Sequence, residues 1–96
     1  MAARITSYEW AVEMTDDDSG DILDVSFWDT YWQALANASL PPEPGCHAVI
    51  ALVRNVHYKA DGDLIDKSYA YLKDGRLPVE FDDGLPVPQR FHAEVR

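Results

Sequence analysis

Three prolines within four residues, in the run Pro41-Pro42-Glu43-Pro44-Gly45, divide this chain of 96 residues. Proline lacks the backbone N–H that helices and sheets use, and its ring collides with the preceding helical turn. A helix before this run must therefore end by residue 40, and regular structure must start again after Gly45. A chain of this length supports one hydrophobic core, so the sequence predicts a single small acidic domain over residues 1–96.

Alternating and apolar runs predict the strands of a sheet. Residues 7–14 alternate between large apolar side chains and polar or small ones, as a half-buried strand does. Turn formers over 15–20 and a short strand over 22–25 complete an acidic hairpin. Residues 46–58 begin with a nearly continuous apolar run, which predicts a long central strand. A turn at 60–63 and a strand over 68–73 then predict a second hairpin.

One helix is predicted over residues 27–38. Its apolar side chains recur at helical spacing, and Trp28 and Trp32 form a neighbouring i, i+4 pair. Ser26 and Asp29 resemble a weak capping box, and Asp29 could alternatively cap a helix that starts one turn later.

Strands separated by a single helix and joined by hairpins favour the α+β class. We expect a two-layer sandwich, with the helix packed on one face of a mostly antiparallel sheet of three to four strands. Residues 77–81 predict a brief edge segment. Prolines at 86 and 88 predict an irregular, Pro-rich C-terminal segment, and residues 82–96 are a candidate extended tail.

Charge is distributed unevenly along the chain. Eight Lys and Arg side chains stand against 17 Asp and Glu, a formal net charge of −9, and neither Lys nor Arg occurs between Ile5 and Val53. Such a field repels nucleic acid and attracts basic partners, which argues against direct nucleic-acid binding. We predict a partner-binding surface made of the carboxylates in this half of the chain. Its members are Glu9, Glu13, Asp16, Asp17, Asp18, Asp21, Asp24 and Asp29.

Aromatic residues make up 11% of the chain, and four of them fall within residues 27–32. One helix can hardly bury all four against a single sheet face. Exposed aromatic rings surrounded by charge are common at interfaces, so Trp28 and Trp32 are predicted to contact a partner or a second copy in a homodimer. The alternative, in which these rings belong entirely to the core, stays open.

The residue patterns predict no active site, cofactor or metal. Read as a calcium loop, residues 16–27 place Asp21 in the glycine position and Phe27 in the glutamate position, so the spacing fails. Cys46 and His47 are adjacent on a predicted strand and point to opposite faces, which prevents them from acting as a nucleophile and base pair. Phosphate loops, nucleophile elbows and paired cysteine motifs do not occur. We therefore expect a protein that is not an enzyme.

The expected location is the cytoplasm. Cys46 is the only cysteine, so an intramolecular disulfide cannot form. The first residues lack the long apolar run of a signal peptide, and no later stretch is long enough to span a bilayer. We expect no contact with a membrane.

Several strings run through most of the chain. They are Tyr8-Glu9-Trp10-Ala11-Val12-Glu13, Gly20-Asp21-Ile22-Leu23-Asp24, Asp29-Thr30-Tyr31, Ser68-Tyr69-Ala70-Tyr71, Asp74-Gly75-Arg76-Leu77-Pro78 and Pro88-Gln89-Arg90-Phe91-His92. In these strings the chain resembles small uncharacterised bacteriophage or prophage proteins. The resemblance implies a viral genomic setting and a site of action in the bacterial host cytoplasm, and it carries no motif of known mechanism. Small acidic phage proteins often bind and block a host protein.

Two functional hypotheses follow. In the first, the chain is a non-enzymatic phage-type accessory protein that inhibits a basic host protein or nucleic-acid-binding complex through its acidic surface. It would then act as a nucleic-acid mimic against a defence complex, as an anti-CRISPR-like protein does. In the second, the chain is a structural or assembly protein that acts as a homo-oligomer.

Overall fold

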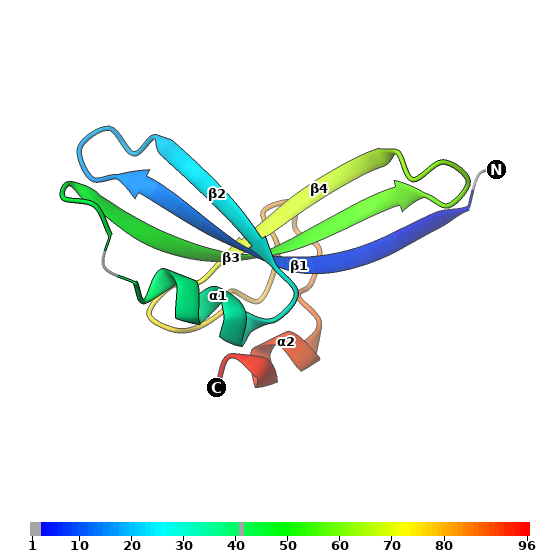
Figure 1. The fold of residues 1–96 in the computed structure, drawn as a ribbon. Helices are drawn as coiled ribbons and strands as arrows, with labels where there is room; N and C mark the ends of the chain where they lie inside the picture. Colours follow the sequence, from blue (N-terminus) through cyan, green and yellow to red (C-terminus); the bar gives the residue numbers. More distant parts are fainter. Residues whose placement is uncertain (1–2, 41) are drawn as a thin grey trace.

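A computed structural model describes residues 3–40 and 42–96. The elements, in chain order, are β1 (Arg4–Asp16), β2 (Ile22–Trp28), α1 (Tyr31–Ala38), β3 (Cys46–Tyr58), β4 (Leu64–Tyr71) and α2 (Gln89–Glu94). The four strands form one antiparallel sheet in the order β2-β1-β3-β4 (Figure 1). The chain is thus a small α+β domain built on an open antiparallel sheet.

The two central strands are much longer than their neighbours. β1 and β3 pair over 13 residues each, whereas β2 pairs with one end of β1 and β4 pairs with the opposite end of β3. Two hairpin arms therefore diverge from the middle of the sheet, one ending in the β1–β2 turn and the other in the β3–β4 turn (Figure 1). This divergence gives the molecule a long dimension of 49 Å.

The main core lies on one face of the sheet, where α1, α2 and the segment between β4 and α2 pack (Figure 1). The sheet contributes Trp10, Val12, Ile50, Leu52 and Ala70, and the covering segments contribute Tyr31, Ala34, Leu77, Phe81, Val87 and Phe91. Trp10 and Leu52 are paired neighbours and are 1% and 0% exposed. The alternation predicted from the sequence thus places Trp10 and Val12 of β1 in this core, with Tyr8 packed against it.

The predicted start of the helix was wrong. α1 begins at Tyr31, and Phe27 and Trp28 belong to β2. Thr30 is the N-cap: its Oγ1 accepts from the Gln33 N–H at 3.2 Å, and Gln33 Oε1 accepts from the Thr30 N–H at 3.1 Å. This reciprocal capping box fixes the start one turn later than predicted. The helix ends at Ala38, before the proline run, in which Pro41 lies outside the described residues.

The sequence predicted an irregular C-terminal segment with residues 82–96 as a candidate extended tail, whereas the structure has a helix within those residues. Asp74 and Gly75 have φ of 52° and 74°, which allows a tight turn that sends the chain back beneath the sheet. Along 77–81 the structure has an isolated bridge, Glu80↔Pro86, in place of a strand. Residues 89–94 form α2, and Phe91 is 7% exposed. Phe91 therefore belongs to the core, and Val95 packs against it.

Candidate protein-binding surfaces

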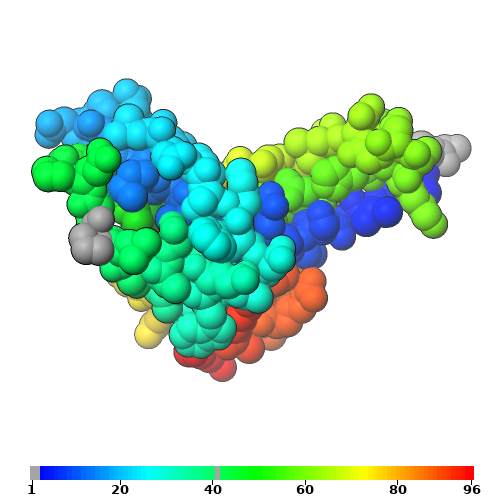
Figure 2. Space-filling view, viewed as in Figure 1, coloured from blue at the N-terminus to red at the C-terminus, as the bar shows by residue number. Residues whose placement is uncertain are grey.

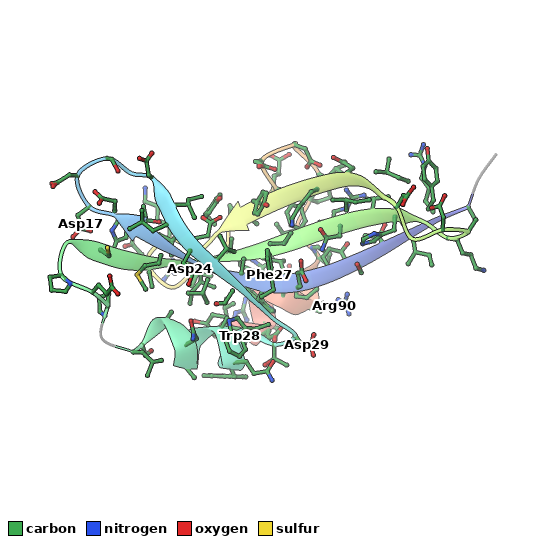
Figure 3. All side chains as sticks on the ribbon, turned by 45° about the horizontal axis from the view of Figure 1, so that its top comes forward. Asp17, Asp24, Phe27, Trp28, Asp29 and Arg90 are labelled. Atoms are coloured by element: carbon green, nitrogen blue, oxygen red, sulfur yellow. The ribbon has the colours of Figure 1, made fainter. Side chains whose placement is uncertain are left out.

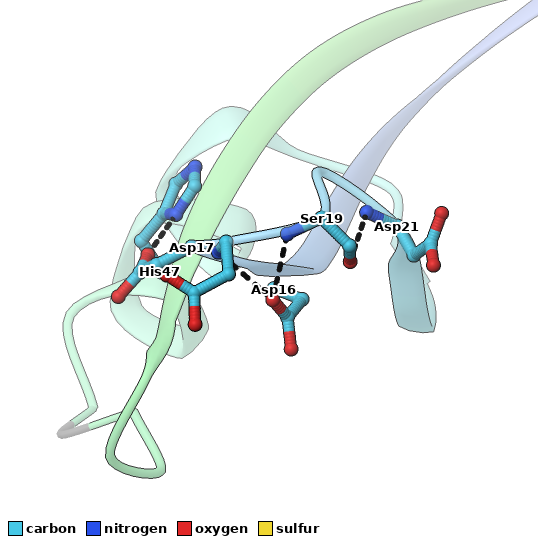
Figure 4. A network of polar contacts seen from close by, with 6 residues as sticks. Asp16, Asp17, Ser19, Asp21 and His47 are labelled. Atoms are coloured by element: carbon cyan, nitrogen blue, oxygen red, sulfur yellow. Dashed lines mark hydrogen bonds and ion pairs between the residues drawn. The ribbon is translucent and has the colours of Figure 1, made fainter.

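The structure gathers four of the predicted carboxylates at the end of the β1–β2 arm. We call Asp16, Asp17, Asp18 and Asp21 the acidic turn. Asp16 Oδ1 accepts from the N–H groups of Asp18 and Ser19 at 2.9 and 3.0 Å, and Ser19 Oγ accepts from the Asp21 N–H at 3.1 Å (Figure 4). The bonds from Ser19 and Asp18 lower the pKa of Asp16, because they stabilise its charged form. Asp16 therefore shapes the turn.

The other three carboxylates of the acidic turn are exposed. Asp17 contacts Nδ1 of His47, which lies at the start of β3 (Figure 4).

Cys46 precedes His47, and burial together with the charges of Asp16 and Glu43 raises the pKa of its thiol. A raised pKa keeps the thiol protonated, so the neighbouring acids make Cys46 a poor nucleophile.

The remaining predicted carboxylates lie elsewhere. Glu9 and Glu13 lie on the sheet face opposite the main core, since they alternate with Trp10 and Val12 along β1. Asp24 Oδ1 accepts from the N–H of Val25 on β2, at the edge of the sheet. Asp29 lies at the junction of β2 and α1, far from Asp17 (Figure 3). The eight carboxylates thus form one turn, one pair and two separate sites.

The face that carries Glu9 and Glu13 is here called the open face, because both described helices lie on the other side of the sheet (Figure 1). Phe27, Ala11, Ala51 and Tyr71 form a row across all four strands on this face. Although no described helix covers them, Ala11 and Ala51 are 0% exposed, as is Val53 in the next row. Side chains from the edge strands must therefore cover the middle of the open face.

Lys67 and two aromatic rings provide this cover. Lys67 Nζ lies 4.8 Å from the centroid of the Phe27 ring on β2 and 5.9 Å from that of Tyr69 on β4. Side chains from the two edge strands therefore meet above the middle of the sheet, and Figure 3 shows Phe27 over its centre. The sequence predicted a common face for Tyr69 and Tyr71, whose rings stack at 5.9 Å. The part played by Lys67 was missed, because it depends on the strand order.

Glu13 is a buried carboxylate, 6% exposed, on the open face. The hydroxyl of Tyr71 donates to Glu13 Oε2 at 3.3 Å, and Asn55 Nδ2 donates to Glu9 Oε1 at 3.1 Å. Burial, followed by the charge of Glu13 and this hydrogen bond, raises the pKa of Tyr71 to about 12. The Tyr71 phenol therefore keeps its proton well above the pH at which a free tyrosine loses it.

This pKa predicts a loss of stability in strong alkali. Between about pH 10, where tyrosine in an unfolded chain ionises, and about 12, the folded state holds a proton that the unfolded state has lost. The free energy of unfolding should therefore decrease as pH rises through this window. Tyr71→Phe lacks the ionisable hydroxyl, so the free energy of unfolding of this variant should decrease less over the same pH range. Urea midpoints measured across that range give both slopes. Tyr58→Phe is the control, and equal slopes for the wild type and Tyr71→Phe would refute the assignment.

The predicted helical pair of Trp28 and Trp32 was wrong in its geometry. Trp28 lies on β2 against the main core, and its Nε1 donates to Ser26 Oγ at 2.9 Å. Trp32 lies on α1 and is 61% exposed, with its ring beside Tyr31 at 5.6 Å. Of the two tryptophans, Trp32 is the one that presents most of its ring to solvent.

Residues 3–40 and 42–96 contain no group of three or more side chains placed to hold a metal ion. Within the same ranges, none of the helices has the length and apolar character needed to cross a bilayer. Comparison of the chain with protein-family models, with curated proteins and with solved structures gives no significant match. The function is therefore inferred from the acidic turn, the open face and the exposed ring of Trp32.

Proposed function

We propose that this protein is a non-enzymatic binding protein that captures a basic protein partner through the acidic turn. The supporting observation is the exposure of three carboxylates, Asp17, Asp18 and Asp21. They belong to the turn between β1 and β2, which forms the outer end of one arm (Figure 2). Side-chain bonds from Asp16 and Ser19 hold the turn, so little ordering is needed when it binds. The net charge of −9 attracts a basic partner over distance.

The partner class in this proposal is a basic host protein or a nucleic-acid-binding complex in the cytoplasm of a bacterium. Its basic groove would accept the carboxylates in place of phosphates, and binding would inhibit it, as expected of a phage-type accessory protein. In this proposal the domain has two layers. α1 and the Pro-containing C-terminal segment form one layer, and the sheet that carries the acidic turn forms the other.

Charge neutralisation at the turn should abolish capture. Asp17→Asn, Asp18→Asn and Asp21→Asn together remove three exposed charges and leave Asp16, which holds the turn, in place. In affinity capture from bacterial lysate, the wild type should retain a basic protein at low salt and release it at high salt, since screening weakens charge attraction. The triple variant should not retain it.

A matched variant controls for net charge. Asp63→Asn, Asp74→Asn and Glu80→Gln also remove three exposed charges, but they lie far along the chain from the acidic turn. This variant should retain the partner as the wild type does. Unchanged capture by the acidic-turn variant, or equal losses in both variants, would refute binding through the acidic turn.

A second candidate function is a homo-oligomeric structural or assembly protein. The exposure of Trp32 favours it, because a large apolar ring at the surface suits a contact between copies. Molecular mass in solution over a range of concentrations separates the two functions. An oligomer that Trp32→Ala dissociates would replace the first proposal, and a monomer at all concentrations would exclude the second.

A further inference from the structure

In the middle of the open face, small side chains lie between larger aromatic ones. The small side chains are here called the floor, and the aromatic side chains on either side of them are called the walls. Ala11 and Ala51 form the floor and are 0% exposed. Phe27 stands in the same row on β2 and is 48% exposed, and Tyr71 ends the row on β4 and is 39% exposed. Because alanine side chains rise little above a sheet, the space between the two walls is left for side chains that reach in from the edges.

A cation lies against the Phe27 side of that space. The ammonium group of Lys67 lies within 6 Å of the Phe27 and Tyr69 rings, at 4.8 and 5.9 Å, which is the range in which an aromatic face attracts a positive charge. Within residues 3–40 and 42–96, Lys67 makes no ion pair. The rings are therefore the partners that hold its charge over the sheet.

Two carboxylates lie beside this space. Glu9 and Glu13 flank Ala11 on β1 and face the same side of the sheet. Glu13 accepts a hydrogen bond from Tyr71, and Glu9 accepts one from Asn55. An ionised carboxylate has about four acceptor sites, so both retain capacity for further donors. Aromatic faces next to carboxylates are the groups that recognise a cationic side chain.

We propose that the open face is a receptor for a lysine or arginine side chain of a protein partner, and that Lys67 occupies it when the protein is free. The partner's cation displaces Lys67 from between Phe27 and Tyr69 and binds near Glu9 and Glu13. The inference rests on the proposed function, since the same basic partner supplies the side chain. It adds a specific contact to the long-range attraction exerted by the acidic turn.

If a partner's cation must displace Lys67, replacement of Lys67 by an uncharged residue should strengthen binding of that cation. Lys67→Met keeps an apolar chain over the floor and removes the competing charge. Lys59→Met makes the same charge change on an exposed residue just beyond the end of β3. With octalysine as the probe, Lys67→Met should bind roughly two- to fivefold more tightly than Lys59→Met, the factor expected of a single cation–π contact. Isothermal titration calorimetry measures both constants at one salt concentration.

A second readout uses the wild type alone. Addition of octalysine should shift the backbone amide signals of Ala11 and Ala51 and the ring signals of Phe27 in nuclear magnetic resonance spectra. Phe27→Leu, which removes one wall at a half-exposed position, should weaken binding of octalysine relative to the wild type. Shifts confined to the acidic turn would refute docking on the open face.

The outcomes separate this inference from the proposed function. Equal affinities of Lys67→Met and Lys59→Met would overturn displacement, and the acidic-turn variant would still report on the turn. If that variant binds octalysine as the wild type does while Lys67→Met binds more tightly, the open face is supported and the turn is not. Absence of binding by every variant would overturn both.

Discussion

Replacement of Trp10 by alanine is expected to lower the free energy of unfolding by about 3–5 kcal/mol, the range for a large aromatic residue removed from a core. Trp10 is 1% exposed, and its ring centroid lies 5.2 Å from that of Tyr31 and 6.2 Å from that of Phe91. It therefore joins β1 to both α1 and α2. Because small domains are stable by only about 5–15 kcal/mol, the urea midpoint followed by far-ultraviolet circular dichroism should fall steeply.

Trp32→Ala provides the matched control, since it makes the same chemical change at a residue that is 61% exposed. Its effect on the free energy of unfolding should stay within about 0.5 kcal/mol, as for most surface substitutions. A similar loss in both variants would contradict the position of Trp10 in the core. A loss confined to Trp32→Ala would mean that α1 presents its other side to the sheet.

Strands were the best predicted part of the fold. The central strand over 46–58 was predicted with the bounds that β3 has, because an apolar run there is bounded by Gly45 and by a turn. The alternation over 7–14 also placed Trp10 and Val12 on one face, and both are in the core. An alternating pattern shows locally which side chains share one face of a sheet. The ends of a strand, in contrast, depend on the strands with which it pairs. β1 accordingly extends beyond the alternating segment at both ends, to Arg4 and Asp16.

The helix start could have been predicted, and the reason for the error is local. Phe27 and Trp28 continue the apolar stripe of α1 when read at helical spacing, and they also fit a strand read at a period of two. The stronger signal lay in Thr30 and Gln33, which have the spacing of a capping box. Interpretation of Ser26 and Asp29 as the cap assigned both aromatic residues to the helix.

The binding surfaces could be predicted only in part. Clustered aspartates among turn formers indicated the acidic turn, because residues 15–20 are adjacent in sequence. The contact of Lys67 with Phe27 joins residues 40 positions apart, on strands separated by two others. It therefore requires the order β2-β1-β3-β4, which no local pattern contains. Net charge likewise could not show that Glu13 is buried and bonded to Tyr71.

Replacement of Phe91 by alanine should lower the free energy of unfolding by about 3–4 kcal/mol, in the range for a buried phenylalanine. Phe91 is 7% exposed, and its ring centroid lies 4.9 Å from that of Tyr8 and 6.2 Å from that of Trp10. α2 has six residues and lacks a side-chain cap, so isolated helix propensity cannot maintain it. Loss of the ring should therefore also unfold α2. The Phe91 N–H donates to the Pro88 carbonyl and the Val95 N–H to the Phe91 carbonyl, so hydrogen exchange at these two amides should become faster.

Phe27→Ala is the control for Phe91→Ala, because it removes a phenylalanine ring that lies outside the main core. Phe27 is 48% exposed on the open face, so its truncation should cost only about 1 kcal/mol and leave exchange in α2 unchanged. If residues 82–96 were the extended tail that the proline pattern indicated, Phe91→Ala would be as mild as Phe27→Ala. A clear difference between the two variants would instead mean that the C-terminal segment closes the main core through the contacts of Phe91 with Tyr8 and Trp10.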